Sequence, residues 1–291
     1  MTLHEKLVEA RARLVAGGIA DADASIDVEV YARTILGWDR ARLLAERSGP
    51  TPAGLEPTFS EWIARRERRE PTAYIVGIRE FWGLDFLVTP SVLIPRPETE
   101  FIVEEAVKLL LSGDPNTGKH GSGRIRVADI GTGSGCVAVA LARECPDCIV
   151  VASDVSSAAL DVARANAARH GVDDRIEFVT TSYLDGVPGP FDLITANPPY
   201  VKDGDKPALS ADVRHEPDVA LFGGREGLRD IAGVLDAAAA KLVPEAWLVM
   251  EFGLGQEDDV RRLVSSRPRL QVRGVRSDLQ GIPRTAMIQR E

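Results

Sequence analysis

The spacing of apolar residues divides the chain into regions of different structure. From residue 1 to about 72, apolar residues recur at helical intervals, as Leu3, Leu7 and Leu14 do. Glycines and polar residues that favour helix ends interrupt this pattern, which predicts four or five short helices in a compact domain. The residues expected to cap the N-termini of these helices are Asp23, Asp39 and Ser60.

Residues 73–95 follow the pattern of β-strands instead. Large apolar side chains, among them Phe81 and Phe86, alternate with polar ones around Gly83. We predict a β-hairpin that links the helical domain to the rest of the chain, residues 96–291.

Short apolar stretches alternate with amphipathic ones through most of this third region. Strands are expected at 125–130, 149–153, 175–179, 191–196 and 247–252, and helices at 135–143, 157–170 and 228–242. The alternation predicts an α/β domain with a parallel sheet. Two further strands near 270–275 and 285–289 are joined by a short connection, so we expect them to pair antiparallel.

A polar, glycine-rich segment at residues 112–123 predicts a mobile surface loop. Part of it, Gly113 to Lys119, resembles a phosphate-binding loop. However, His120 replaces the Ser or Thr that would hold magnesium, and Gly121 follows where a helix should begin. We therefore reject nucleoside triphosphate binding at this segment.

The composition narrows the class of protein. Its 291 residues are 44% apolar and 27% charged, as is typical of a globular protein that can bury a full core. The formal net charge of -9 argues against affinity that depends on broad neutralisation of phosphates, so we expect no direct nucleic-acid binding. No apolar run approaches the ~20 residues that cross a bilayer, and the first residues lack an apolar signal core. We expect a cytoplasmic protein without a membrane partner.

Cysteines and histidines give no support for a metal site. The three cysteines, Cys136, Cys145 and Cys148, are too few for a disulfide framework and fit a reducing compartment. Cys145 and Cys148 have the spacing of metal ligands, but no second Cys or His pair completes a zinc site. The four histidines are scattered along the sequence.

A glycine-rich motif follows the strand predicted at 125–130 and opens the next helix. Its small residues let backbone amides approach a ligand closely. A dinucleotide-binding motif would have a third glycine at Cys136, so NAD is disfavoured. Asp154 ends the next strand, where a carboxylate can accept hydrogen bonds from the ribose hydroxyls of an adenosine cofactor. The residues of the motif expected to contact that cofactor are Gly131, Thr132, Gly133, Ser134 and Gly135.

The sequence Asn197-Pro198-Pro199-Tyr200 is the most specific motif. It follows the strand at 191–196, so it should lie at the carboxyl edge of the sheet, where ligands bind. An amide nitrogen is a poor nucleophile, and a catalyst must orient it and accept its N–H bonds. The side-chain oxygen of Asn197 and the carbonyl of Pro198 are the acceptors, and Tyr200 can stack on the planar group, which predicts methylation of such a nitrogen.

These motifs resemble those of class I methyltransferases that modify amide or exocyclic amino nitrogens. Three further segments resemble the HemK/PrmC family of release factor glutamine methyltransferases, and with them the resemblance covers nearly the whole chain. They are Glu70 to Ile75, Arg79 to Gly83 and Leu93 to Glu100, joined downstream by Arg214-His215-Glu216-Pro217 and Gly223-Gly224.

The resemblance implies the fold, the cofactor and the reaction. The fold would be a helical N-terminal domain, a β-hairpin and a Rossmann-like domain with a seven-stranded sheet. S-adenosyl-L-methionine would donate a methyl group to the N5 nitrogen of glutamine in the GGQ motif of a release factor, with Asn197 also contacting the cofactor. The residue beside adenine would be Ser182 or Tyr183.

Two other classes compete with this interpretation. An adenine-N6 nucleic-acid methyltransferase would present the same geometry to Asn197, although the acidic balance argues against it. A non-catalytic module that keeps the pocket only for stability would have no need of an intact NPPY motif.

The N-terminal domain, residues 1–72, contains no catalytic motif, and we expect it to recognise the protein substrate. Its last helix carries four arginines between glutamates, a pattern typical of a solvated face or of a surface that contacts a partner. These arginines are Arg65, Arg66, Arg68 and Arg69.

Overall fold

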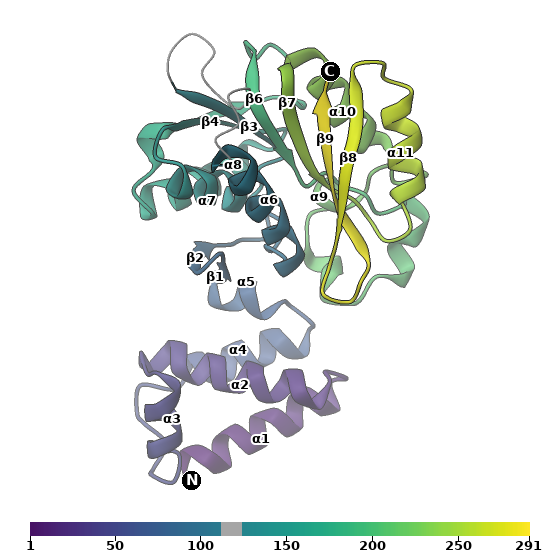
Figure 1. Ribbon diagram of the computed structural model, residues 1–291. Helices are drawn as coiled ribbons and strands as arrows, with labels where there is room; N and C mark the ends of the chain where they lie inside the picture. Colours follow the sequence, from purple (N-terminus) through teal and green to yellow (C-terminus); the bar gives the residue numbers. More distant parts are fainter. Residues whose placement is uncertain (112–123) are drawn as a thin grey trace. The chain divides into compact units, whose positions relative to one another are not determined.

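The chain forms two compact units in the computed structural model, which describes residues 1–111 and 124–291 (Figure 1). Unit 1 comprises Met1–Ile78 together with Ser210–His215, and unit 2 comprises Arg79–Leu209 and Glu216–Glu291. A short segment from the second half of the sequence therefore belongs to the N-terminal unit, which no sequence pattern indicated. Residues 112–123, with the rejected phosphate-binding loop, lie outside the described residues.

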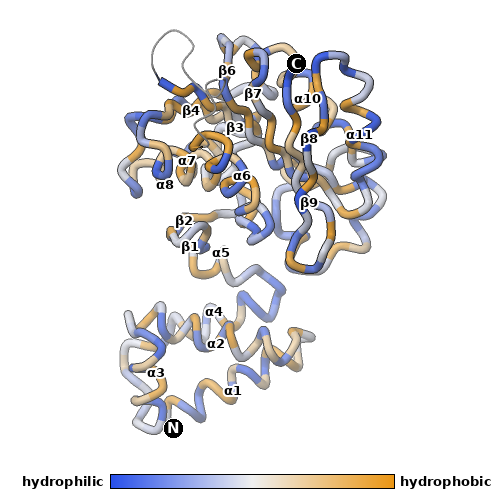
Figure 2. Tube along the Cα trace, viewed as in Figure 1, coloured by the Kyte–Doolittle hydropathy of each residue, from blue (hydrophilic) through white to orange (hydrophobic). Residues whose placement is uncertain are grey.

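Unit 1 is helical, as predicted. Its elements are α1 (Leu3–Ala16), α2 (Asp21–Leu36), α3 (Arg40–Glu46), α4 (Thr58–Glu67), α5 (Thr72–Val76) and the 3-10 helix η4 (Val213–His215). Apolar positions recur along these helices (Figure 2). They share one core, in which Leu3, Leu14, Tyr31 and Phe59 are fully buried. The period of the apolar residues thus correctly predicted which side of each helix is buried.

Only one of the three predicted N-caps is confirmed. Asp39 caps α3 by accepting a hydrogen bond from the backbone N–H of Arg42 at 2.7 Å. The predictions for Asp23 and Ser60 are wrong, because both residues lie inside a helix. Asp23 is in the first turn of α2, where an acidic side chain is favourable beside free backbone N–H groups, so it gives the same sequence signal as a cap.

The arginine-rich end of α4 is mostly paired within unit 1 and does not form a fully solvated face. Arg66 is only 5% exposed and bonds to Asp27 at 2.7 Å. Asp212, from the segment Ser210–His215, bonds to both Arg66 and Arg69 at 2.8 Å. A buried guanidinium needs such partners because desolvation of an unpaired charge is costly. Burial of Arg66 could not be read from the charge pattern of one helix, since both carboxylates are distant in sequence.

The strand predicted from residue 73 onward is wrong over its first residues. Thr72–Val76 form the short helix α5, which ends at Gly77 with a φ of 80°. Tyr74 and Ile75 are both buried, and consecutive buried side chains fit a helix packed on a core better than a strand, whose neighbours point to opposite faces.

The β-hairpin itself is confirmed and is shorter than predicted. Strands β1 (Ile78–Phe81) and β2 (Leu84–Leu87) form a two-stranded sheet. Trp82 and Gly83 connect them with φ values of 56° and 69°, the left-handed backbone that a tight two-residue turn requires. Phe81 and Phe86 are buried in a core of unit 2, so the hairpin is part of that unit's packing.

Unit 2 contains the seven-stranded sheet that the resemblance implied. The strands are β3 (Ile125–Ile130), β4 (Cys148–Asp154), β5 (Ile176–Thr180), β6 (Phe191–Ala196), β7 (Leu242–Glu251), β8 (Leu270–Ser277) and β9 (Pro283–Arg290). Their order is β5-β4-β3-β6-β7-β9-β8. The first five are parallel, and β8 pairs antiparallel with β9 as predicted, while β9 also pairs antiparallel with β7.

Helices cover both faces of this sheet (Figure 1). The helices of this unit are η1 (Pro97–Thr99), α6 (Glu100–Leu111), α7 (Cys136–Glu144), α8 (Ser157–Arg169), η2 (Asp173–Arg175), η3 (Asp203–Ala208), α9 (Asp218–Leu221), α10 (Arg229–Lys241) and α11 (Glu257–Ser265). Val150 packs in one core with α6 and α7, whereas its neighbour Val151 packs in the other core with α10 and α11. Because successive side chains of a strand point to opposite faces, each strand supplies both cores.

The order of the strands fixes where a ligand can bind. From β3 the chain continues to β4 on one side, and from β6 it continues to β7 on the other. A crevice opens between neighbouring strands whose connections run in opposite directions. In the register of the sheet Ile130 pairs with Ser153 of β4 and with Ala196 of β6. The glycine loop, Asp154 and Asn197 therefore all begin at the same level of the sheet edge.

Cysteine chemistry differs from the prediction. Cys145 and Cys148 form a disulfide with their Cα atoms 5.4 Å apart, which the sequence analysis did not predict. The sequence spacing allowed this, because the turn between α7 and β4 brings the two residues together. Cys136 is a free, buried cysteine.

Two features are absent from the described part of the chain. No group of three or more His, Cys, Asp or Glu side chains there is arranged to hold a metal ion. Over residues 1–111 and 124–291, no helix has the length and apolar character needed to cross a membrane.

Candidate active site

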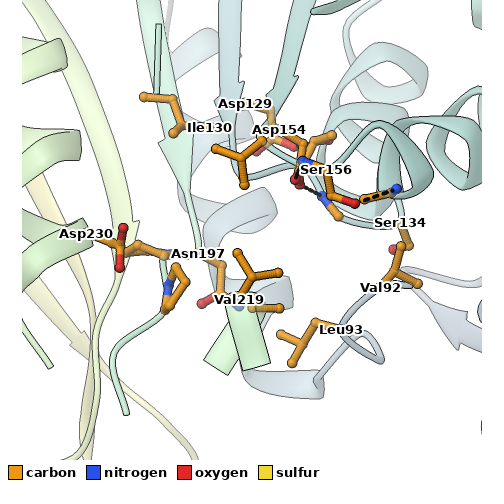
Figure 3. A pocket seen from close by; sticks show the side chains of 18 of the residues that line it. Val92, Leu93, Asp129, Ile130, Ser134, Asp154, Ser156, Asn197, Val219 and Asp230 are labelled. Atoms are coloured by element: carbon orange, nitrogen blue, oxygen red, sulfur yellow. Dashed lines mark hydrogen bonds between the residues drawn. The ribbon is translucent and has the colours of Figure 1, made fainter. Parts of the chain in front are cut away.

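A pocket in unit 2 opens at the carboxyl edge of the sheet, where the sequence motifs were expected to meet (Figure 3). The predicted site residues that line it are Gly131, Thr132, Gly133, Ser134, Asp154, Ser182, Tyr183, Asn197, Pro198 and Pro199. Figure 3 shows Asp154 and Ser156 together in one part of the pocket, with Asn197 apart from them. Two predicted site residues, Gly135 and Tyr200, are not among the lining residues.

The glycine loop is held by backbone hydrogen bonds. The N–H groups of Gly131 and Thr132 both donate to the carbonyl of Ser153, at 2.8 and 2.9 Å. Gly131 and Gly133 have φ values of 69° and 55°, which glycine adopts without strain. This conformation leaves the backbone of the loop facing the pocket.

Gly135 has a structural task, and the cofactor contact predicted for it stays a prediction. A Cβ atom at this position would lie 3.0 Å from the Cβ of Ala163, in the neighbouring helix α8. The absence of a side chain at Gly135 therefore allows α7 to start close against α8, which is the packing role of the third position in such loops.

Asp129 supports the loop from below. It is fully buried, and it accepts hydrogen bonds from the hydroxyls of Thr132 at 2.6 Å and Thr195 at 2.8 Å. Burial raises the pKa of Asp129 to about 6, against the lowering effect of the two hydroxyls. The hydroxyl hydrogen of Thr132 is thus engaged by Asp129.

Asp154 accepts two backbone hydrogen bonds, one on each carboxylate oxygen. The N–H of Gly133 bonds to one oxygen and the N–H of Ser156 to the other, both at 2.9 Å. Burial raises the pKa of Asp154 from its ordinary value, while these backbone bonds lower it. Each carboxylate oxygen has two lone pairs, so one acceptor position per oxygen stays free for a ligand hydroxyl.

Both candidates for the adenine contact, Ser182 and Tyr183, line the pocket. Tyr183 has a φ of 50°, and its hydroxyl donates to Asp230 at 3.0 Å. A Cβ atom at Gly233 would lie 2.1 Å from the Tyr183 ring, so a glycine on α10 makes room for that ring. Both residues therefore lie at the site, and a contact of either one with adenine stays a prediction.

The NPPY motif is anchored by a buried chain of side-chain hydrogen bonds. The Nδ2 of Asn197 donates to the Oγ1 of Thr99 at 3.0 Å, and that hydroxyl donates to Glu251 Oε2 at 2.8 Å. The hydroxyl of Tyr200 donates to the other oxygen of Glu251 at 3.0 Å. Thr99 and Glu251 are 3% and 2% exposed.

The charges in this network act on each other. The negative charge of Glu251 and burial together raise the pKa of the Tyr200 hydroxyl, so Tyr200 stays neutral and donates. Burial also raises the pKa of Glu251, opposed by the hydrogen bonds from Thr99 and Tyr200. Tyr200 therefore supports the motif through Glu251, and the stacking on substrate expected for it stays a prediction.

Two glycines allow the backbone of the motif to be approached closely. A Cβ atom at Gly223 would lie 2.3 Å from the carbonyl oxygen of Pro199, and one at Gly227 would lie 2.2 Å from that of Tyr200. Gly227 also has a φ of 70°. Close packing against the motif therefore explains why a glycine is needed at Gly223, the first residue of the downstream pair Gly223-Gly224.

Several residues of the site were not predicted. Thr99 and Glu251 had no motif of their own, and Asp230 lies on a helix that was expected only as packing. Glu216 is 4% exposed, pairs with Arg96 and accepts from the N–H of Ile94 at 3.0 Å, which fixes the segment before η1. Thr99 and Glu216 fall in segments of the family resemblance, which was their only sequence signal, and Glu251 and Asp230 had none.

Comparisons with known proteins agree with this geometry. Residues 5–77 match the PrmC N-terminal domain, and residues 102–216 match the methyltransferase small domain. A release factor glutamine methyltransferase of Bradyrhizobium diazoefficiens is 37% identical over 281 residues, covering 95% of this chain and 93% of the relative. Another, from Nitratidesulfovibrio vulgaris, is 44% identical over 232 residues, covering 78% and 75%.

The solved structures support the fold. A methyltransferase from Pyrococcus furiosus superposes with a TM-score of 0.52 at 18% identity, covering 79% of this chain and 98% of that one. Such low identity shows only that the architecture is shared.

The cofactor expected from the sequence is confirmed by the family matches. This chain is an S-adenosyl-L-methionine-dependent methyltransferase, and its pocket fits that group in two respects. The glycine loop presents backbone without side chains, and Asp154 keeps acceptors free beside it. The chain belongs to the release factor glutamine methyltransferase family.

Proposed function

We propose that this protein methylates the N5 nitrogen of a glutamine in the GGQ motif of peptide chain release factors. The observation that carries the proposal is Asn197 at the pocket wall, with its Nδ2 already bonded to Thr99. One N–H of the carboxamide is then directed at Thr99, and the oxygen at its other end can accept a hydrogen bond from a substrate amide. The names of the relatives support a release factor as the substrate.

The residues of the glycine loop and Asp154 would hold the cofactor. Backbone from Gly131 to Ser134 would face it, and Asp154 would accept hydrogen bonds from ribose hydroxyls. Ser182 and Tyr183 are the candidates for the adenine end. S-adenosyl-L-methionine supplies an electrophilic methyl group when it is bound.

The task of the protein's own residues is to orient a weak nucleophile. The two N–H bonds of a glutamine amide would be accepted by Asn197 Oδ1 and by the carbonyl of Pro198, which fixes the plane of the amide. Pro198 and Pro199 restrict the backbone, so this pair of acceptors is preorganised. A proton must leave the amide nitrogen after transfer, and these acceptors hold it at the start of that path.

Unit 1 is proposed to recognise the release factor. A single glutamine is too small to select one protein, whereas a standard protein interface buries roughly 1,600 Å². Unit 1 contains none of the pocket-lining residues and offers exposed apolar side chains such as Ile26, which is 60% exposed. Because translation terminates in the cytoplasm, we expect the protein to act there, without membrane or nucleic-acid partners.

The test is a reconstituted reaction followed by mass spectrometry. Purified release factor and S-adenosyl-L-methionine should yield a product heavier by one methyl group on the GGQ glutamine, and Asn197→Ala should not produce it. Oligonucleotides containing adenine should remain unmodified. Methylation of the oligonucleotide but not of the release factor would favour the adenine-N6 alternative and reject the proposal.

A further inference from the structure

We infer that Thr99 and Glu251 form a hydrogen-bond relay that sets which end of the Asn197 carboxamide faces the substrate. The inference deepens the proposed function and rests on it, since it concerns how the amide acceptor is prepared. Thr99 and Glu251 are positioning residues, because neither is placed here in contact with the reacting atoms.

The direction of the relay follows from counting donors. An ionised carboxylate can only accept hydrogen bonds, and a threonine hydroxyl has a single hydrogen. Thr99 gives that hydrogen to Glu251 Oε2 at 2.8 Å. Its oxygen can then only accept from Asn197, and the group that approaches it at 3.0 Å is the Nδ2 amide. The Oδ1 of Asn197 is left as the acceptor for the substrate.

The opposite orientation would place donor against donor. If the Asn197 carboxamide were turned by 180°, its NH₂ group would meet the NH₂ group of the substrate glutamine, and neither could accept. Burial sharpens this choice, because Thr99 and Glu251 are almost inaccessible to water that could substitute as a partner. The relay therefore favours one of two carboxamide orientations that have nearly the same shape.

The second oxygen of Glu251 is occupied as well. Tyr200, at the end of the same motif, donates its hydroxyl to Oε1 at 3.0 Å. With both oxygens engaged, the carboxylate cannot rotate to release Thr99 without losing a bond. One buried glutamate at the end of β7 thus holds both the first and the last residue of the NPPY motif.

The first test removes the hydroxyl without changing the shape of the side chain. In Thr99→Val, kcat on release factor should fall about 10- to 100-fold, while the dissociation constant for S-adenosyl-L-homocysteine, measured by calorimetry, changes less than about twofold. Thr99→Ser should restore kcat to within about threefold.

A matched control is Thr285→Val on β9. Thr285 is fully buried and paired in register with Glu251, and its Oγ1 has no hydrogen-bond partner among the described residues. This control should keep kcat within about twofold.

The second test reverses the direction of the relay. In Glu251→Gln, the new amide can donate to Thr99, which frees the hydroxyl hydrogen to bond Asn197 Oδ1 and favours the wrong orientation. We expect a loss in kcat as large as that of Thr99→Val, again with little change in affinity for S-adenosyl-L-homocysteine.

A measurement without substrate separates the relay from the proposed function. The side-chain NH₂ signals of Asn197, assigned by their absence in Asn197→Asp, should exchange slowly with solvent in the wild type and at least about tenfold faster in Thr99→Val. Wild-type protein that fails to methylate release factor would reject the proposed function and leave this measurement interpretable. Unchanged exchange, or a kcat within about threefold of wild type in both Thr99→Val and Glu251→Gln, would overturn the relay. So would a parallel loss of cofactor affinity and kcat in both variants, since that is what a general structural defect produces.

Discussion

The two ends of the pocket are built by different physical means. At the glycine loop, backbone groups bond to Ser153 and Asp154 only some 20 residues away, and a continuous motif specifies the geometry. At the NPPY end, Asn197 and Tyr200 are held by Thr99 and Glu251, which lie 98 and 51 residues away along the chain. Local sequence is sufficient to predict the first end, whereas the second depends on contacts that only the fold brings together.

Removal of the amide acceptor at the NPPY end should have the largest effect. In Asn197→Ala we expect kcat to fall on the order of 10²–10³-fold, because the lost hydrogen bond matters most when the amide is held for transfer. Affinity for S-adenosyl-L-homocysteine should change only modestly, since the glycine loop and Asp154 remain. Steady-state kinetics and calorimetry on the same variant measure both quantities. Loss of cofactor binding with kcat unchanged at saturation would mean that the two ends do not divide the work as proposed.

Asp129 accepts hydrogen bonds from Thr132 in the glycine loop and from Thr195 just before the NPPY motif, so it links the two ends. Its negative charge should lower the free energy of unfolding once the pH is high enough to ionise it. Burial raises its pKa to about 6 from an ordinary value of 3.8, a difference that corresponds to about 3 kcal/mol. The folded protein binds the proton more tightly than the unfolded chain, so this penalty grows as the pH rises from about 4 to about 6 and is complete above that. Asp129→Asn carries no such charge. Its free energy of unfolding relative to wild type should therefore increase by about 2 kcal/mol between pH 4 and pH 7.5, measured with urea. A constant difference between the two proteins would show that Asp129 ionises normally.

The sequence predicted most of unit 2 because its signals are local. Short apolar strands such as β6 (Phe191–Ala196) were found to the residue, since burial on both faces of a parallel sheet gives an uninterrupted apolar run. Residues 73–76 were assigned to a strand because the short helix Thr72–Val76 has too few residues to establish a helical period. The membership of Ser210–His215 in unit 1 depends on Asp212 bonding to Arg66 and Arg69, pairs more than 140 residues apart that no periodicity reports.

The candidate site was predicted to the extent that its residues belong to motifs. Asp154 was found because it ends a strand at a fixed distance from the glycine loop. Glu251 also ends a strand, but it reads as an ordinary acidic residue after an apolar run, and its burial comes from η1 and the NPPY segment packing over it. Gly135 shows a different limit of the motif, because the sequence did not indicate that this glycine also lets α7 pack closely against α8.

Loss of the ribose acceptor should affect binding much more than turnover. In Asp154→Ala we expect the KM for S-adenosyl-L-methionine to rise on the order of 10- to 30-fold, with kcat at saturating cofactor within about threefold of wild type. The reason is that the ribose is remote from the methyl group that moves. The variant also removes two backbone bonds from the loop, so Asp154→Asn, whose oxygen can keep one of them, serves as the milder control. A kcat that falls as far as in Asn197→Ala would break the division between the two ends.

The smallest effect is expected outside the pocket, at the one arginine of the α4 cluster that remains available to a partner. Arg65 pairs with Glu70, and Arg66 and Arg69 pair with Asp212, whereas the side chain of Arg68 is exposed and bonds to no other described residue. If unit 1 recognises the release factor, Arg68→Glu should lower kcat/KM about threefold through KM alone, because a charge at the rim of an interface mainly affects association. The effect should shrink between about 50 mM and 300 mM salt, as screening weakens it.

Arg169→Glu, the same charge change at an exposed position at the end of α8 in unit 2, is the matched control. Affinity for S-adenosyl-L-homocysteine should be the same in wild type and in both variants. A change that is confined to the protein substrate would then assign recognition of the release factor to unit 1. Equal kcat/KM in Arg68→Glu and Arg169→Glu would show that Arg68 takes no part in this recognition.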